Sequence, residues 1–123
     1  MGSKLFYINL RAFLKDLNYV FPDDNELKLI TSSLSIYCMD DSECTVINGF
    51  WNSLAHLEEY ILTRDPSFFT VDHSLFWKQT SHEYQLFTKL NYYWVQMDVK
   101  NKKVVWDYIQ LLYKLSKDYN LNN

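Results

Sequence analysis

The chain has 123 residues, a formal net charge of −3 and a large share of aromatic side chains, with 8 Phe, 4 Trp and 10 Tyr against two glycines and two prolines. A chain of this length can bury a sizeable core, so we expect a single domain over residues 1–123 that needs no disulfide. Two glycines are too few for a Gly-rich phosphate loop, and no uncharged run reaches the length of a membrane span.

The composition favours an AT-rich coding genome as the main source of the aromatic excess. Gly, Ala, Arg and Pro, which have GC-rich codons, are all scarce, whereas Asn and Tyr are abundant. Nucleotide composition therefore accounts for part of the rings, and their number alone indicates no chemistry. The scarcity of helix-breaking residues favours an all-α fold.

The first predicted helix covers residues 4–21, where the apolar positions follow the helical steps of three and four. These positions are Phe6, Leu10, Phe13, Leu14, Leu17 and Val20. Pro22 ends this helix, and Asp23 or Asp24 is expected to cap the next one. The apolar face of the second helix consists of Leu27, Ile30, Leu34 and Tyr37.

A third helix is expected after the break at residues 40–42, with Asp41 or Ser42 as its N-cap. Its apolar face consists of Val46, Phe50, Leu54, Leu57 and Ile61. Gly49 lies inside this helix at a cost of about 1 kcal/mol relative to alanine, which indicates close packing at that point. The pair Asp65-Pro66 is typical of an N-cap followed by proline in the first helical position, and it opens a short turn.

Residues 66–80 are the least regular part of the chain. No helical or strand period is visible there, and the large apolar residues are Phe68, Phe69, Leu75, Phe76 and Trp77. We expect this segment to fold as a plug over one end of the bundle. The fourth helix follows from about Ser81 and has a residue of its inner face on each successive turn. These residues are Glu83, Phe87, Leu90, Trp94 and Met97.

The fifth predicted helix, residues 101–119, has a polar stripe only one residue wide. The stripe consists of Lys103, Asp107, Gln110, Lys114 and Lys117. A helix of this kind contacts other structure around most of its circumference. Either it lies at the centre of its own bundle or a partner covers one flank, and the first interpretation is favoured.

We find no motif for catalysis or metal binding. His56 and Glu58 match a short element of zinc deaminases, but the accompanying PCxxC motif is absent. His82-Glu83 begins like HExxH, yet Leu86 stands where the second histidine would be. The histidines and cysteines do not have the spacing of a metal site. We therefore expect a protein that is not an enzyme and that uses no cofactor, no metal and no small-molecule substrate.

Charge and targeting signals bear on partners and location. Residues 1–15 carry +3, residues 16–83 carry −9 and residues 84–123 carry +3. The acidic middle disfavours general nucleic-acid binding, unless the first and last helices pack side by side and merge their charges into one basic strip. No secretion signal or membrane span is visible, and Cys38 and Cys44 are interpreted as free thiols of a reducing compartment. We expect an intracellular protein of the host cytoplasm or nucleus, with packaging in a virion as an option.

Residues spread over most of the chain resemble small helical proteins encoded by nucleocytoplasmic large DNA viruses. The resemblance rests on Phe21-Pro22-Asp23, Tyr60-Ile61, Asp65, Phe68-Phe69, Trp94, Val105-Trp106-Asp107-Tyr108-Ile109, Leu112 and Leu115-Ser116. Where those proteins tend to have Asn-Pro after the second helix, this chain has Asp40-Asp41. The resemblance implies a viral origin, in agreement with an AT-rich genome, and it brings no activity or site residues with it.

A second resemblance concerns viral helical bundles that mimic apoptosis regulators. The segment Asn48-Gly49-Phe50-Trp51 is similar to their Asn-Trp-Gly-Arg signature, although the order differs and the arginine is missing. In that family the arginine pairs with an acidic residue of a bound helix, so its absence argues against groove binding by this chain.

The leading hypothesis is a non-enzymatic viral protein–protein interaction module, as a virion component or an adaptor, whose partner is a host protein, a viral protein or a second copy. Tyr and Trp often anchor interfaces, so we predict partner binding in two aromatic places. These are Phe68, Phe69, Phe76 and Trp77 in the irregular segment, and Trp106, Tyr108 and Tyr113 on the last helix. The alternatives are a nucleic-acid-binding accessory protein that uses the basic first and last helices, and a helical-bundle inhibitor of host apoptosis or immune signalling. In each case the predicted fold is a single compact all-α bundle of about five helices, with the aromatic-rich irregular segment between the third and the fourth.

Overall fold

The computed structural model describes residues 3–122, and all regular elements among them are helical. The α-helices are α1 (Ser3–Val20), α2 (Asn25–Met39), α3 (Thr45–Leu54), α4 (Glu58–Thr63), α5 (His82–Trp94) and α6 (Val99–Leu121). Short 3-10 helices connect them: η1 (Ala55–Leu57), η2 (Pro66–Thr70) and η3 (His73–Leu75). The predicted all-α bundle is confirmed, and the aromatic irregular segment lies where it was expected, before α5.

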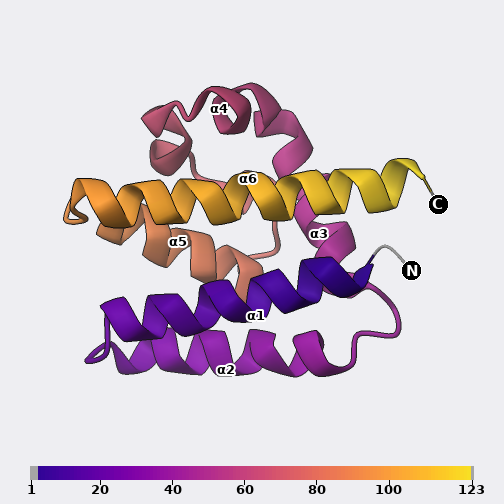
Figure 1. Ribbon diagram of the computed structural model, residues 1–123, viewed down its shortest axis with the longest axis horizontal. Helices are drawn as coiled ribbons and strands as arrows, with labels where there is room; N and C mark the ends of the chain where they lie inside the picture. The colour runs from indigo at the N-terminus through magenta and orange to yellow at the C-terminus, as the bar shows by residue number, and fades with distance from the viewer. Residues whose placement is uncertain (1–2, 123) are drawn as a thin grey trace.

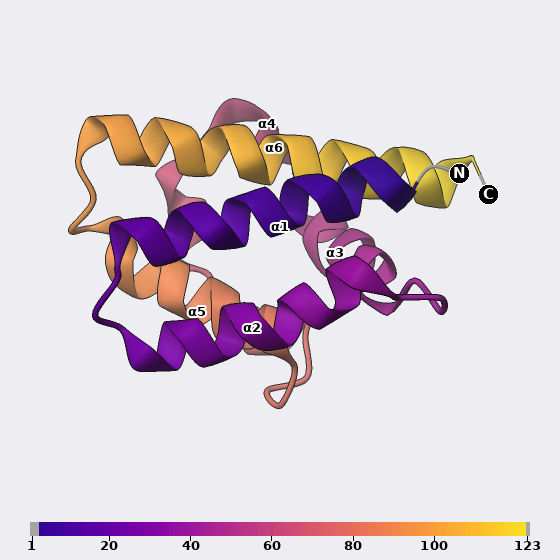
Figure 2. The ribbon, with the colours of Figure 1, turned by 60° about the horizontal axis from the view of Figure 1, so that its bottom comes forward.

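Helix α1 lies between α2 and α6 (Figure 1, Figure 2). It runs antiparallel to both neighbours, so the end of α1 and the beginning of α6 meet at the same end of the bundle. Helices α2, α1 and α6 thus form one layer. On one side of this layer, α5 packs on α2 and α3 packs on α6. The short helix α4 also contacts α6, so α6 packs against three other helices.

Side-chain caps begin several helices at the predicted places. Asp24 caps α2, Ser81 caps α5, and Asp65 precedes the proline that opens η2. In each case a side-chain oxygen accepts a hydrogen bond from a backbone N–H that has no partner inside its helix. The last helix begins at Val99, two residues before the predicted start, because Asp98 caps it.

The predicted third helix is wrong in two respects. It is interrupted, because α3 ends at Leu54 and α4 begins at Glu58 after a 3-10 turn. This break places α4 against α6 and η2 while Leu57 and Ile61 both stay buried. The N-cap position is also different, since it holds Cys44 in the left-handed conformation, with a φ of 55°.

Asp41 nevertheless binds the free backbone N–H groups at the beginning of α3, although it lies three residues before the N-cap position. Its carboxylate accepts hydrogen bonds from the backbone N–H groups of Thr45 and Val46, both at 3.0 Å. The hydroxyl of Tyr7 on α1 donates to the same carboxylate. Burial first and then this hydrogen bond raise the pKa of Tyr7 well above its usual value, so the hydroxyl remains a donor. Asp41 therefore joins the start of α3 to α1.

Aromatic rings occupy the centre of the bundle. Fully buried side chains include Phe6, Phe13, Phe50, Phe68 and Phe87. Gly49 lets α3 approach its neighbours closely, because a Cβ atom there would lie 3.3 Å from Glu83 Oε2 and 3.4 Å from Trp77 Nε1. The close packing predicted at this glycine is confirmed.

Cys38 and Cys44 are free thiols, as predicted. Among residues 3–122, no helix has both the length and the apolar character needed to cross a membrane.

Candidate protein interface

Five of the seven aromatic residues predicted to bind a partner lie in the core. They are Phe68, Phe69, Trp77, Trp106 and Tyr113, each at most 7% exposed. Phe69 stacks on Trp94 with ring centroids 3.8 Å apart, and Trp106 packs edge-on against both. Because a partner cannot reach these five rings in this structure, we assign them to the core and correct the prediction of a partner surface there.

The other two predicted residues, Phe76 and Tyr108, are half-buried. Phe76 stacks on His56 with ring centroids 5.3 Å apart. Tyr108 stacks on Phe13 of α1 at 4.8 Å, and its hydroxyl donates to the Asp16 carboxylate at 2.7 Å. Burial first and then this hydrogen bond raise the pKa of Tyr108 to about 12. Tyr108 thus joins α6 to α1 at a seam that is partly open to solvent.

Helix α6 packs on its own chain through one face, whose buried residues are Val105, Trp106, Ile109, Leu112, Tyr113 and Ser116. The flank that remains open lies beside α1, where Val104 and Leu111 are both 37% exposed. These residues and Tyr108 follow steps of four and three, so they form one row along the helix. The open flank is apolar and narrow.

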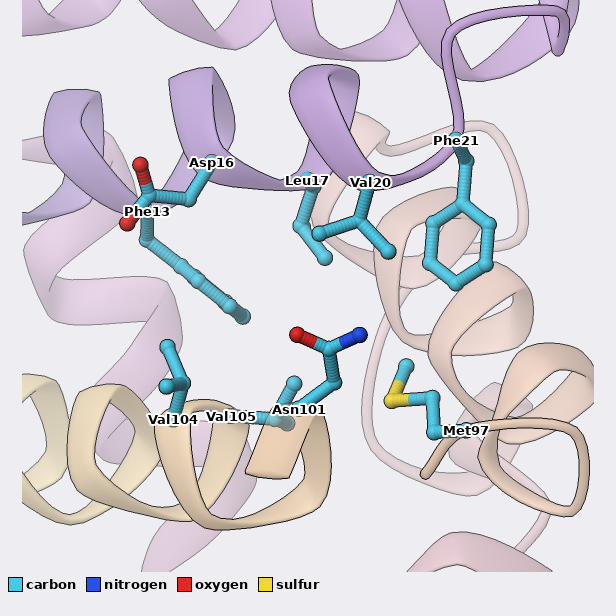
Figure 3. Close-up of a pocket in the computed structure, with 9 residues that line it drawn as sticks. All are labelled: Phe13, Asp16, Leu17, Val20, Phe21, Met97, Asn101, Val104 and Val105. Carbon is cyan, nitrogen blue, oxygen red and sulfur yellow. The ribbon is translucent and has the colours of Figure 1, made fainter. Parts of the chain in front are cut away.

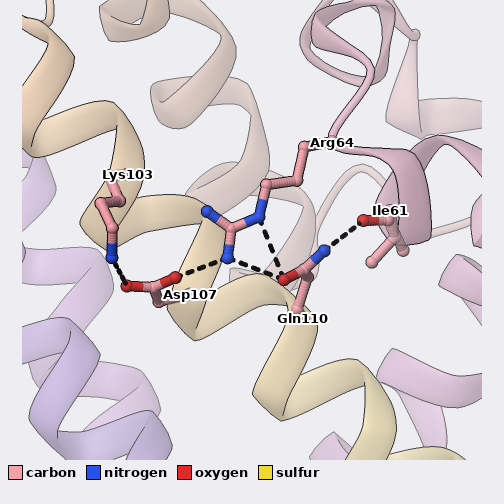
Figure 4. A network of polar contacts seen from close by, with 5 residues as sticks. All are labelled: Ile61, Arg64, Lys103, Asp107 and Gln110. Carbon is pink, nitrogen blue, oxygen red and sulfur yellow. Dashed lines mark hydrogen bonds and ion pairs between the residues drawn. The ribbon is translucent and has the colours of Figure 1, made fainter.

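The polar stripe of α6 is joined to α4 by a network around Arg64 (Figure 4). The Arg64 guanidinium donates to Gln110 Oε1 at 3.1 and 2.8 Å and pairs with Asp107 at 2.5 Å. The Gln110 amide donates to the backbone carbonyl of Ile61, and Lys103 pairs with Asp107. These contacts hold α4 on α6.

A narrow apolar crevice lies between the end of α1 and the beginning of α6 (Figure 3). It is lined by Phe13, Asp16, Leu17, Val20, Phe21, Met97, Asn101, Val104 and Val105. The Asn101 amide points from α6 toward α1. The enclosed space is about 20 Å³, which holds about one water molecule and is far below the roughly 300–1,000 Å³ of small-molecule pockets. The crevice can therefore receive the tip of one apolar side chain.

Asp16 gives this crevice a single negative charge. Its side chain is exposed, and it makes no ion pair among residues 3–122. Other carboxylates near the same helices behave differently, since Asp107 and Glu58 each pair with a cation. A carboxylate that has a hydrogen bond from Tyr108 but no ion pair, beside an apolar crevice, favours a ligand that brings its own cation.

Helices α1 and α6 pack side by side, which is the arrangement that a shared basic strip would require. Lys4, Arg11 and Lys15 form one row on α1, because they are seven and four residues apart. On α6, the lysines that pair with carboxylates are Lys103, Lys114 and Lys117. The apolar flank with Val104 and Leu111 separates these lysines from α1. The α1 cations and these three α6 lysines therefore lie in separate rows.

A hollow of about 370 Å³ beside α4 contains titratable side chains at its surface. Among the residues that line it are His56, Glu59 and Asp65. None of these three is buried. In the part of the chain that the structure describes, no three His, Cys, Asp or Glu side chains are grouped so that they could hold a metal ion.

His73 is a buried polar residue that the sequence patterns did not single out. It is 2% exposed, and neither of its ring nitrogens has a hydrogen-bond partner within the described chain. Phe68, Trp77 and Phe87 surround the ring. Burial lowers the pKa of His73 to about 4, against a smaller opposite effect of Asp72, so the imidazole is neutral at pH 7.

The crevice itself was missed at the sequence level because its two walls come from opposite ends of the chain. Asp16 and Asn101 lie in the first and last helices, and a single sequence does not show that these helices are neighbours. One signal was available, since Asp16 is the only acidic residue in the first predicted helix.

Comparisons with protein-family models, curated protein sequences and solved structures found no match for the chain.

Proposed function

We propose that this chain is a non-enzymatic protein–protein interaction module of viral origin, acting as a virion component or an adaptor. The observation that supports the proposal best is the crevice between α1 and α6, where apolar residues border the exposed Asp16 carboxylate. Grooves between the helices of a bundle are common binding sites, and the small enclosed space here suits a protein side chain better than a separate small molecule.

The partner that fits this seam is a helical segment with an apolar side chain for the crevice and a lysine or arginine for Asp16. Val20 and Val104 line the crevice and are 36% and 37% exposed, so a partner side chain can contact them from solvent. Leu111 and Leu5, which is 59% exposed, continue the apolar surface toward the other end of the seam. A partner helix lying along α1 and α6 would therefore bury apolar residues over several turns.

The test is quantitative affinity purification with three tagged forms of the full chain: native, Asp16→Lys and Glu43→Lys. Glu43 is an exposed acid between α2 and α3, so its replacement is a control with the same change of charge. A true partner is retained by the native chain and by Glu43→Lys, and it is depleted at least about tenfold by Asp16→Lys.

A charge exchange then decides whether the contact is direct. Replacing the matching lysine or arginine of the purified partner by glutamate should restore binding to Asp16→Lys. If no retained protein distinguishes Asp16→Lys from Glu43→Lys, or if the exchange restores nothing, the α1/α6 seam is not the docking surface and the proposal fails.

A nucleic-acid-binding accessory function is the second candidate, and the row of Lys4, Arg11 and Lys15 favours it. These three cations are exposed and make no ion pair among residues 3–122. If all three contact phosphates of a duplex, the logarithm of the binding constant should fall with the logarithm of salt concentration with a slope of about −3. Filter binding of duplex DNA measures this slope. No retention at low salt, or retention that Arg11→Glu leaves unchanged, eliminates this function.

A further inference from the structure

Helix α2 exposes large apolar side chains on the face opposite the core. Leu29, Ile36 and Met39 are 71%, 68% and 77% exposed. Leu29 and Ile36 are seven residues apart and Met39 follows three residues later, so the three lie along one face of the helix. The core-facing residues of α2, among them Leu27 and Leu34, point the other way. In Figure 1 this helix forms the lower edge of the bundle, with no other helix beyond it.

The middle of this outer face, from Leu29 to Met39, has no charged residue, and the exposed Lys28 and Asp40 border it at the two ends. Between Lys28 and Asp40 the chain has no Asp, Glu, Lys or Arg, and the exposed position between Leu29 and Ile36 is Ser32. The outward face of a surface helix normally has charged and polar residues, as the stripe of α6 does. An AT-rich genome does not explain the difference, because Lys and Asn are also among the residues that such a genome favours.

We infer that the outer face of α2 binds a second copy of this chain. In a two-fold symmetric dimer the same patch faces itself, so any charge near the axis would meet a like charge. The α2 face meets this requirement because it has no charge over three turns. Ser32 is compatible with its own copy as well, since a hydroxyl both donates and accepts hydrogen bonds and its small size lets two helices approach.

The cations of α1 limit the contact to α2. Lys4, Arg11 and Lys15 form an exposed row on the neighbouring helix, and two copies of that row would repel each other if α1 also entered the interface. A fifteen-residue helix is about 22 Å long, and one face of it is smaller than the roughly 800 Å² per partner of a standard interface. We therefore expect a reversible dimer with a dissociation constant in the micromolar range.

This inference does not depend on the proposed partner at the α1/α6 seam, because the two surfaces use different helices. If both hold, the dimer presents two crevices. A partner with two matching segments would then bind more tightly than one with a single segment, through the higher effective concentration of the second site.

Sedimentation equilibrium of the full chain over a range of concentrations tests the inference. The native protein should pass from monomer to dimer, and both Leu29→Glu and Ile36→Glu should weaken the association at least about tenfold. The matched control is Leu62→Glu, because Leu62 on α4 is 63% exposed and receives the same change away from α2. This control should dimerise like the native chain.

Far-UV circular dichroism and thermal unfolding establish that each variant is folded, which is expected since all three positions are exposed. A native chain that stays monomeric at several hundred micromolar overturns the inference. The inference is also overturned if Leu29→Glu and Ile36→Glu leave dimerisation intact. It is overturned as well if Leu62→Glu weakens dimerisation as much as they do. Partner binding separates the two proposals, because Asp16→Lys should still dimerise and Ile36→Glu should still bind a partner that depends on Asp16.

Discussion

Asparagine at position 24 should destabilise the protein, because the Asp24 carboxylate joins the start of α2 to α5. One oxygen accepts a hydrogen bond from the backbone N–H of Leu27 at 2.9 Å, which caps α2. The other pairs with Lys89 Nζ at 2.9 Å and accepts a hydrogen bond from the Tyr93 hydroxyl. Asparagine keeps the cap, since it is itself a good N-cap residue, but it removes the negative charge.

The size of the effect follows from the surroundings of this carboxylate. Burial alone would raise the pKa of Asp24, but the hydrogen bonds from Tyr93, Leu27 and Lys89 outweigh it and hold the pKa at about 2. The difference from the ordinary value of 3.8 corresponds to at most about 2.5 kcal/mol of folding stability. Because the pair lies at the edge of the bundle and water screens it, we expect Asp24→Asn to lose about 1–2 kcal/mol. Asp24→Ala should lose about 1 kcal/mol more, since the cap is lost as well.

Urea unfolding at pH 7 measures these losses, with Asp23→Asn as the control because the neighbouring Asp23 is exposed. The folded-state pKa of Asp24 lies below the unfolded value, so its contribution is complete above about pH 4 and is lost as the pH falls toward 2. The difference in unfolding free energy between native chain and Asp24→Asn should therefore shrink over that interval. Equal losses for Asp23→Asn and Asp24→Asn, or a difference that does not change with pH, would refute the reasoning.

Two further predictions concern the aromatic segment. Phe68→Ala should lower the free energy of unfolding by about 3–5 kcal/mol, because the Phe68 ring is fully buried. Phe76→Ala should lower it by about 1–2 kcal/mol, because the Phe76 ring is half-buried. Chemical denaturation measures both losses, and equal losses would contradict the assignment of Phe68 to the core. The pKa of His73 is about 4 in the folded chain and 6.5 ordinarily, so the native protein should lose stability as the pH falls from 6.5 to 4, with no further loss from this residue below that range. His73→Phe should remove this part of the pH dependence. It should also stabilise the chain at pH 7, because no ring nitrogen without a hydrogen bond is then buried. If the variant and the native chain lose stability equally with pH, His73 is not the titrating group.

The positions of helices could be predicted from sequence wherever the signal is local. Asp24 and Ser81 are caps because a side-chain oxygen reaches a backbone N–H only a few residues away. The break between α3 and α4 was missed because the apolar period continues through it. The chain changes direction at this break so that α4 can pack on α6, and α6 is distant in the sequence.

The candidate site was less predictable than the fold. Trp106 and Tyr113 had the residue types of an interface, yet the same types fill a core, and only the packing of α6 against three helices shows that they are buried. Tyr108 is the predicted residue that lies at the crevice seam, through its contacts with Phe13 and Asp16.

Helical periodicity and caps act over a few residues, so they were sufficient to predict an all-α bundle with many aromatic side chains in its core. The packing of the helices determines which rings are hidden and which surfaces are open. It brings Asp16 and Asn101, from the first and last helices, to one crevice, and it leaves Leu29 and Ile36 of α2 exposed without a covering helix. Both outcomes depend on how helices that are far apart in the chain pack on one another, and a helical period indicates an apolar face without indicating what covers it.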